Sequence, residues 1–200
     1  MLTRDVALSA LRNAGCSEDV IKHCLTVERK AVEIAEKIKG NGHKVDLELV
    51  RVGAILHDIG RAVTHGISHG IEGAKILRKL GLEDFTNFAE NHIGAGIPRD
   101  EAEMLGLPSK DFLPKSLEEK IVAYADKLVS GNVIISFEEA REQFKAQIGA
   151  GENHPALKRL DALHAQIQSF MAKRKEVEKE KKEKEKNITL PSSGPLLLRS

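Results

Sequence analysis

The sequence is poor in aromatic residues and in net charge. Phe, Tyr and Trp make up 4% of its 200 residues, and tryptophan is absent. Proteins that bind single-stranded nucleic acids stack bases on aromatic side chains, so this composition argues against such a surface. Lys and Arg number 31 against 30 Asp and Glu. Because excess basic charge supplies much of the affinity for nucleic acids and anionic membranes, we expect neither as the main partner.

Cysteines and long apolar runs are scarce as well. The two cysteines, Cys16 and Cys24, form neither a disulfide framework nor a thiolate metal motif. No apolar run is long enough to span a bilayer, and the first residues, Met1–Asp5, lack the apolar region of a signal peptide. We therefore expect a reduced, cytoplasmic setting and no membrane partner.

Helical patterns fill most of the chain. Residues 4–14 predict a short helix ended by Gly15, and 18–39 predict a longer one with apolar residues at helical spacing. Asp46 is a good N-cap for a helix that runs into His57. Further helices are predicted at 68–80, 84–91, 98–104 and 137–148, and from about residue 155 onward. Another is predicted to begin at the capping box 116–119 and to run to 127. No stretch alternates with a period of two, so the predicted fold class is all-α.

A change in composition near residue 172 divides the chain. Thirteen of the fourteen residues in 173–186 are charged, eight basic and five acidic. We predict a domain over 1–172 and a charged C-terminal extension over 173–200, either a solvated helix with Glu–Lys pairs or a disordered segment. A homo-oligomer formed through this extension is possible, although it lacks a sustained apolar seam.

The tetrapeptide His57-Asp58-Ile59-Gly60 follows the apolar run 50–56. An imidazole and a carboxylate at the buried end of a helix are costly to desolvate unless a cation satisfies them. Neighbouring helical residues point about 100° apart, so both reach one ion only where the helix ends. Gly60 is the residue type that ends helices at such a position. The tetrapeptide therefore suggests a divalent metal site.

Further histidines and an aspartate lie near predicted helix ends or beside small residues. Together with the tetrapeptide they make a set of six: His23, His57, Asp58, His69, His92 and Asp126. These nitrogen and oxygen donors suit Mn, Fe, Co, Ni or Zn. Two divalent ions would leave the site a net charge of roughly +2, which favours an anionic substrate. A single histidine is more commonly a core or surface residue, and we assign His43, His154 and His164 that way.

The order His, His-Asp, His, His, Asp resembles that of the HD superfamily of metal-dependent phosphohydrolases, and residues 57–60 match its HDIG variant letter for letter. The likeness covers about 18–130, or up to about 170 with the following helices. It extends to the segments Val52–Leu56, His69–Ala74, His92–Gly96 and Ala125–Leu128. The chain is most similar to small, stand-alone HDIG-domain proteins of archaea and bacteria. The resemblance implies the HD-domain helical bundle.

The resemblance also implies an arrangement of ligands for one or two divalent ions (Mn, Fe, Co, Ni, Zn or Mg). A first ion would be held by His23, His57, Asp58 and Asp126, and Asp58 would bridge to a second ion held by His69 and His92. Some members carry a further histidine directly before the one matched by His92. This chain departs from that pattern with Asn91.

The implied reaction is hydrolysis of a phosphomonoester or phosphodiester, a nucleotide or a small phosphorylated metabolite, by a metal-activated hydroxide. Asp58 would be catalytic, because it would orient the nucleophile or accept its proton. Arg61 and Lys127 would either neutralise phosphoryl oxygens or form ordinary surface ion pairs. His65, four residues before His69, is a phosphate contact, a surface residue or a substitute ligand.

Two other functions fit the same residues. With two irons, the ligand set resembles that of HD-type oxygenases, which cleave C–C or C–P bonds with O2. Alternatively, the fold and its metal could persist in a regulatory module with little turnover. The cyclic-dinucleotide HD-GYP phosphodiesterases are not supported, because no Gly-Tyr-Pro motif follows His57 and Asp58.

Overall fold

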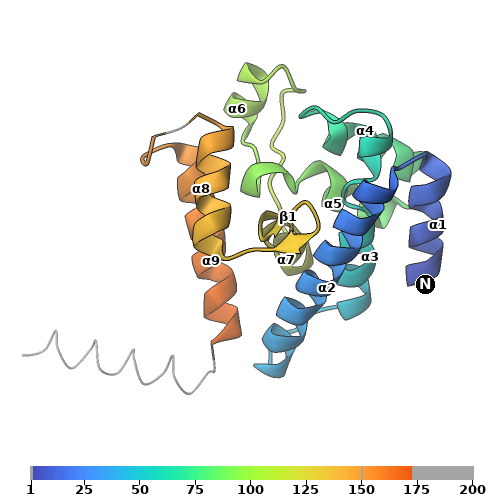
Figure 1. Ribbon diagram of the computed structural model, residues 1–200, viewed down its shortest axis with the longest axis horizontal. Helices are drawn as coiled ribbons and strands as arrows, with labels where there is room; N and C mark the ends of the chain where they lie inside the picture. The colour runs from blue at the N-terminus through green and yellow to red at the C-terminus, as the bar shows by residue number, and fades with distance from the viewer. Residues whose placement is uncertain (1, 150, 173–200) are drawn as a thin grey trace, which may run out of the picture.

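A computed structural model describes residues 2–149 and 151–172 of the protein. Over these residues the chain is helical, which confirms the predicted fold class, and the predicted extension 173–200 lies outside them. The elements are α1 (Arg4–Ala14), α2 (Glu18–Gly40), α3 (Leu47–Leu56), η1 (Ile59–Ala62), α4 (His69–Lys79), η2 (Glu83–Phe85), α5 (Thr86–Glu90), η3 (Ile93–Ala95), α6 (Arg99–Met104), α7 (Leu117–Lys127), β1 (Val129–Ser130), β2 (Val133–Ile134), α8 (Phe137–Gln147) and α9 (Pro155–Met171), where η marks a 3-10 helix (Figure 1).

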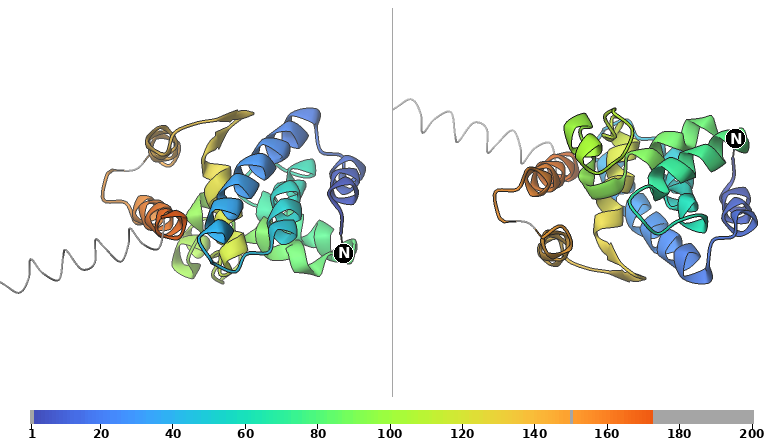
Figure 2. Two further views of the ribbon diagram at one scale, coloured as in Figure 1. Left: turned by 90° about the horizontal axis from the view of Figure 1, so that it is seen from below. Right: turned by 90° about the horizontal axis from the view of Figure 1, so that it is seen from above.

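Helix α7 lies at the centre of the bundle. It packs against α2, α3 and α9, and Figures 1 and 2 show α1 at one end of the molecule and the α8–α9 pair at the other. Because neighbours cover α7 on several sides, its residues Ile121–Ala125 are all buried. Apolar burial of this kind is the main favourable contribution to folding. The burial of Ile121–Ala125 also brings Asp126, the next residue of α7, into the interior. No helix of the described residues is long and apolar enough to cross a membrane.

Two predicted caps set the register of the helices that carry site residues. The Asp46 side chain accepts hydrogen bonds from the backbone N–H groups of Glu48 and Leu49, both at 3.0 Å, and starts α3. The Ser116 hydroxyl accepts from the Glu119 N–H at 3.0 Å and starts α7. A cap is worth about 1 kcal/mol. Since a helix rises about 1.5 Å per residue, these starts determine where His57 and Asp126 emerge.

The sequence did not predict the small hairpin that follows α7. Strands β1 and β2 pair antiparallel, with Val129 opposite Ile134 and Ser130 opposite Val133. Strands of two residues are too short for a period-two pattern to be visible. Their turn contains Gly131, which has a positive φ of 59°. The hairpin places the Gly131 carbonyl beside helix α2, where it contacts a histidine of the site.

Gly60 does not end a helix, and that interpretation of the sequence was wrong. Helix α3 already ends at Leu56, and Gly60 lies inside η1 without a positive φ. Instead, helix α4 crosses η1 very closely. A Cβ atom on Gly60 would lie 1.9 Å from the carbonyl oxygen of His69 and 2.4 Å from the amide nitrogen of Gly73. The glycine is needed for this approach, which brings His69 to the tetrapeptide.

Both cysteines are predicted to be unreactive in the folded protein. Cys16 and Cys24 are free and buried, and the Cys16 thiol contacts the carbonyl of Ile59 at 3.5 Å. Burial raises the pKa of Cys16 to about 11 and that of Cys24 well above its usual value. Because the thiolate is the reactive form, a disulfide reagent at neutral pH should titrate no thiol in the native protein and both after unfolding. Rapid labelling of either cysteine before unfolding would contradict this prediction.

Candidate metal centre

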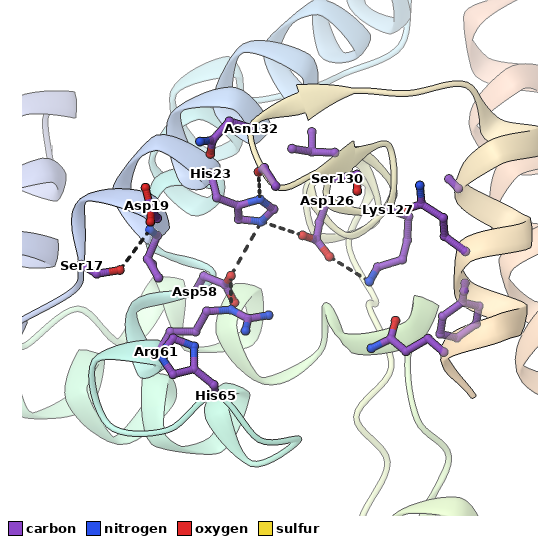
Figure 3. A pocket seen from close by; sticks show the side chains of 17 residues that line it. Ser17, Asp19, His23, Asp58, Arg61, His65, Asp126, Lys127, Ser130 and Asn132 are labelled. Atoms are coloured by element: carbon purple, nitrogen blue, oxygen red, sulfur yellow. Dashed lines mark hydrogen bonds and ion pairs between the residues drawn. The ribbon is translucent and has the colours of Figure 1, made fainter. Parts of the chain in front are cut away.

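The six residues singled out in the sequence come together in the interior of the bundle. They are contributed by α2, the turn after α3, α4, the turn after α5, and α7: His23, His57, Asp58, His69, His92 and Asp126. All are buried except His23, which is partly exposed. Figure 3 shows His23, Asp58 and Asp126 directed toward one another from separate elements.

One group of ligand atoms surrounds Asp126. Its Oδ1 lies 3.1 Å from His23 Nε2 and 3.5 Å from His57 Nε2. The Oδ2 atom of Asp58 faces the same two histidines, at 3.7 Å from His23 Nε2 and 3.8 Å from His57 Nε2. His23, His57 and Asp126 each offer a ligand atom within 4.8 Å of the others, a spacing that one ion could occupy.

A second group surrounds the other oxygen of Asp58. Asp58 Oδ1 lies 3.1 Å from His69 Nε2 and 3.4 Å from His92 Nε2, and these two nitrogens are 3.1 Å apart. His57 is also close enough to share an ion with Asp58 and His92. The two oxygens of one carboxylate therefore face two different sets of imidazoles, so Asp58 is placed between two candidate sites.

Hydrogen bonds to the backbone determine which nitrogen of each imidazole is free. Each of the four rings has its Nδ1 atom within hydrogen-bond distance of a carbonyl: His23 with Gly131 at 2.8 Å, His57 with Ala54 at 2.7 Å, His69 with Gly66 at 2.8 Å and His92 with Ala89 at 2.8 Å. A carbonyl oxygen can only accept, so Nδ1 carries the proton in each ring. In the neutral ring the Nε2 lone pair then points into the cluster, as in metal-binding histidines.

The interior of the cluster is rich in acceptors and poor in donors. His57 Nε2 and Asp58 Oδ1 are buried without a hydrogen-bond partner in the described part of the chain. A hydrogen bond between the facing Nε2 atoms of His69 and His92 would require one ring to carry two protons. Buried acceptors that face one another cost free energy unless a cation lies among them. Four imidazoles and two carboxylates suit a borderline divalent metal ion, so the residues fit such a group.

The protonation states of Asp58, Asp126 and His92 agree with metal binding. For His23, burial acts to lower the pKa, but the facing carboxylates of Asp126 and Asp58 raise it above its usual value. Burial acts to raise the pKa values of Asp58 and Asp126, but nearby histidines, and Lys127 beside Asp126, lower both well below their usual value. Burial lowers the pKa of His92 to about 4. At neutral pH the carboxylates are therefore ionised and His92 is neutral, which are the forms that bind a metal ion.

Two cations lie at the rim of the cluster. The Arg61 Nε donates to Asp58 Oδ2 at 2.5 Å, and the Lys127 Nζ lies 3.1 Å from Asp126 Oδ2. Both line a cavity of about 810 Å³ that opens over His23, Asp58 and Asp126. Figure 3 shows Arg61 and Lys127 on opposite sides of this cavity. Each of these residues therefore makes an ion pair with a carboxylate of the cluster and also faces the cavity.

Two further residues have clear positions. His65 is exposed in the segment before α4, lines the cavity, and belongs to neither ligand group. Because α4 begins only at His69, His65 does not lie on the same helical face as His69. Its interpretation as a substitute metal ligand is therefore not supported. Asn91 donates through Nδ2 to Glu119 Oε2 at 3.3 Å, so its side chain ties α5 to the first turn of α7.

Sequence reasoning missed the residues that complete the site from α8 and from the hairpin. Gln143, Phe144 and Gln147 of α8 line the cavity, and Gly131 orients His23. The sequence Ser130-Gly131-Asn132 is typical of a turn and could have indicated the hairpin. Nothing local in α8 indicates that it faces the cluster, because its position depends on packing against α9.

Fold and site together define a helical domain with a buried imidazole and carboxylate cluster suited to divalent metal ions. The family model of the HD domain matches residues 20–131. The chain belongs to the HD-domain family, which confirms the resemblance seen in the sequence.

Known proteins similar to this chain differ in length. An uncharacterized protein of Methanocaldococcus jannaschii is 50% identical over 166 residues, which cover 82% of this chain and 96% of that protein. A tRNA (cytidine(56)-2'-O)-methyltransferase of Picrophilus torridus is 39% identical over 166 residues, 82% of this chain but only 46% of the relative. The solved HD domain of the L. monocytogenes phosphodiesterase PgpH is 18% identical with a TM-score of 0.48, and the match covers 83% of this chain and 99% of that one.

Proposed function

We propose that the protein is a metal-dependent hydrolase of phosphomonoesters or phosphodiesters, with a nucleotide or a small phosphorylated metabolite as substrate. The observation that carries the proposal is the cluster, in which His57 Nε2 and Asp58 Oδ1 are buried without a hydrogen-bond partner among the described residues while Arg61 and Lys127 lie at the rim. Membership of the HD-domain family supports a metal-dependent phosphohydrolase at the level of the superfamily.

The distances support a division of the ligands into two sets that share Asp58. His23, His57, Asp126 and the Oδ2 of Asp58 would hold one ion. The Oδ1 of Asp58, with His69 and His92, would hold a second. Bound divalent ions lower the pKa of a water ligand toward about 7 and polarise a phosphoryl oxygen. The donor set alone does not select among Mn, Fe, Co, Ni, Zn and Mg.

The chain's own residues would position and neutralise the phosphoryl group. Asp58 is buried among histidines and ionised, so it would orient the nucleophile or accept its proton. Arg61 and Lys127 face the cavity from opposite sides and each carries a positive charge toward a phosphate bound there. His65, exposed at the cavity, is proposed as a further phosphate contact.

Elemental analysis combined with a substrate panel tests the proposal. The purified protein should carry one or two equivalents of a divalent metal and hydrolyse at least one member of a panel of phosphomonoesters, cyclic nucleotides and dinucleotides. A chelator should remove the metal and the activity together, and the added metal should restore both. Metal-loaded protein that is inactive against the whole panel would contradict the proposal and favour a regulatory module. Two irons with O2 uptake would favour an oxygenase.

A further inference from the structure

A groove of about 490 Å³ lies at the N-terminal end of α3, at the opposite end of that helix from His57. Its apolar side chains come from the start of the chain, from α3 and from the segment around η2: Leu2, Leu49, Val52, Leu82 and Phe85. Val52 is buried, and the other four are partly exposed. Because covering apolar surface is favourable by about 25 cal/mol per Å², this groove can bind an apolar segment.

The charged side chains that line the groove are all acidic: Asp46, Glu48, Glu83 and Asp84. Asp46 caps α3, and Glu48 pairs with Arg51 at 3.1 Å. Glu83 and Asp84 are exposed at the rim. Among the described residues, no basic side chain lines the groove. The groove therefore favours a segment that combines apolar side chains with positive charge, because opposite charges attract across an interface.

The last described helix ends beside the loop that precedes α3. The Asn41 side-chain amide donates to the carbonyls of Phe170 and Met171, at 3.1 and 2.7 Å, and so fastens the end of α9 to the end of α2. His43 packs edge-on against Phe170, with ring centroids 4.9 Å apart. Figures 1 and 2 show the ends of these two helices side by side. Ala172, which follows α9, therefore lies near the start of the loop 41–46.

A depression of about 810 Å³ follows this loop and meets the groove. His43, which contacts Phe170, lines the depression, and Asp46 and Glu48 line both the depression and the groove. The other charged side chains in its walls have both signs: Lys39, Lys44 and Glu118. A continuous surface therefore leads from the end of α9 to the groove.

The chain beyond Ala172 has a composition that matches these two surfaces. Residues 173–186 include eight basic and five acidic residues, which suits the mixed charge of the depression. Further on, residues 196–198 are three successive leucines, followed directly by Arg199. The leucines begin 24 positions after Ala172. Even at the helical rise of about 1.5 Å per residue, this length spans about 36 Å, more than the diameter of a small domain, so the leucines can reach the groove.

From these observations we infer that the groove binds segment 196–199 of the same chain, with the leucines on the apolar floor and Arg199 among the carboxylates of the rim. The inference goes beyond the proposed function and does not depend on it, because the groove and the metal cluster lie at opposite ends of α3. A tether within one chain gives an effective concentration of about a millimolar, so a weak contact is occupied. This favours the chain's own segment over that of a second copy.

A nitroxide attached at Ser200→Cys in the full chain tests the inference by NMR. Cys16 and Cys24 are buried, so the label should modify the new thiol alone. The nitroxide should broaden the amide signals of Leu82 and Phe85 and leave those of α8 sharp, and reducing the nitroxide should restore them. A sample in which isotope-labelled protein without nitroxide is mixed with unlabelled protein that carries it should show no broadening, because the contact is within one chain.

Leu197→Asp is the test variant in the spin-labelled protein, and Ser193→Asp is its matched control. Each adds one negative charge to the same segment, and both positions lie outside the described helices, so the fold should be unchanged. Leu197→Asp should abolish the broadening at the groove, and Ser193→Asp should keep it. Glu83→Lys at the rim should weaken it. Absence of broadening in the parent, or broadening that survives Leu197→Asp, would overturn the inference. Broadening in the mixed sample alone would also overturn it, because the segment would then come from a second copy.

Discussion

Replacing Asp58 with asparagine is expected to lower phosphoester hydrolysis by about 10³-fold or more and to reduce the bound metal. The two oxygens of Asp58 face His23 and His57 on one side and His69 and His92 on the other, so one change affects both sets of ligands. An amide has nearly the volume of a carboxylate but no charge. The variant should therefore fold and yet lose the charge that balances a bound cation.

Asp84→Asn provides the matched control for this prediction. Asp84 is an exposed carboxylate in η2 that does not line the cavity at the cluster. Its asparagine variant should keep metal content and kcat within about twofold of the wild type. Metal content by elemental analysis, helicity by circular dichroism and kcat on the best substrate should be measured side by side. Full activity of Asp58→Asn would show that the cluster is not the reaction centre.

Replacing Gly60 with alanine is expected to destabilise the protein by about 3 kcal/mol, near the upper end of what overpacking costs. The added Cβ would meet the His69 carbonyl oxygen at 1.9 Å and the Gly73 nitrogen at 2.4 Å, and both are backbone atoms that cannot rotate away. For a chain of this size the loss corresponds to a fall in Tm of roughly 6–12 °C. Because α4 must move to relieve the clash, His69 should also leave Asp58 and activity should drop.

Gly40→Ala is the control for the glycine prediction. Gly40 is the last residue of α2, and a Cβ there would meet nothing within 4 Å. Alanine favours helix by up to about 1 kcal/mol, so the stability of this variant should stay the same or rise slightly. Thermal unfolding of the two variants under identical metal conditions measures the difference. Equal Tm values would show that α4 and η1 do not pack as closely as the structure has them.

The helices and their limits could be predicted because their determinants are local. The cap at Asp46 lies within three residues of the amide groups it satisfies, and the left-handed Gly15 directly follows the helix it ends. Apolar residues at helical spacing similarly identify each buried face within a few turns. The hairpin after α7 escaped notice because two residues per strand carry too little pattern. The role of Gly60 was misinterpreted because the atoms that exclude a side chain there belong to α4.

The sequence by itself determined the all-helical fold and singled out the six residues proposed as metal ligands, because helical periodicity and the order of the histidines and aspartates can be read along the chain. The tertiary structure decided how those residues are grouped. His23 meets Asp126 across 103 positions, and His69 meets His92 across 23. It also placed α8 against the cluster, where its residues form part of the cavity wall. Such contacts join segments whose separation along the chain carries no information on their distance in space, so only packing of the whole bundle determines them.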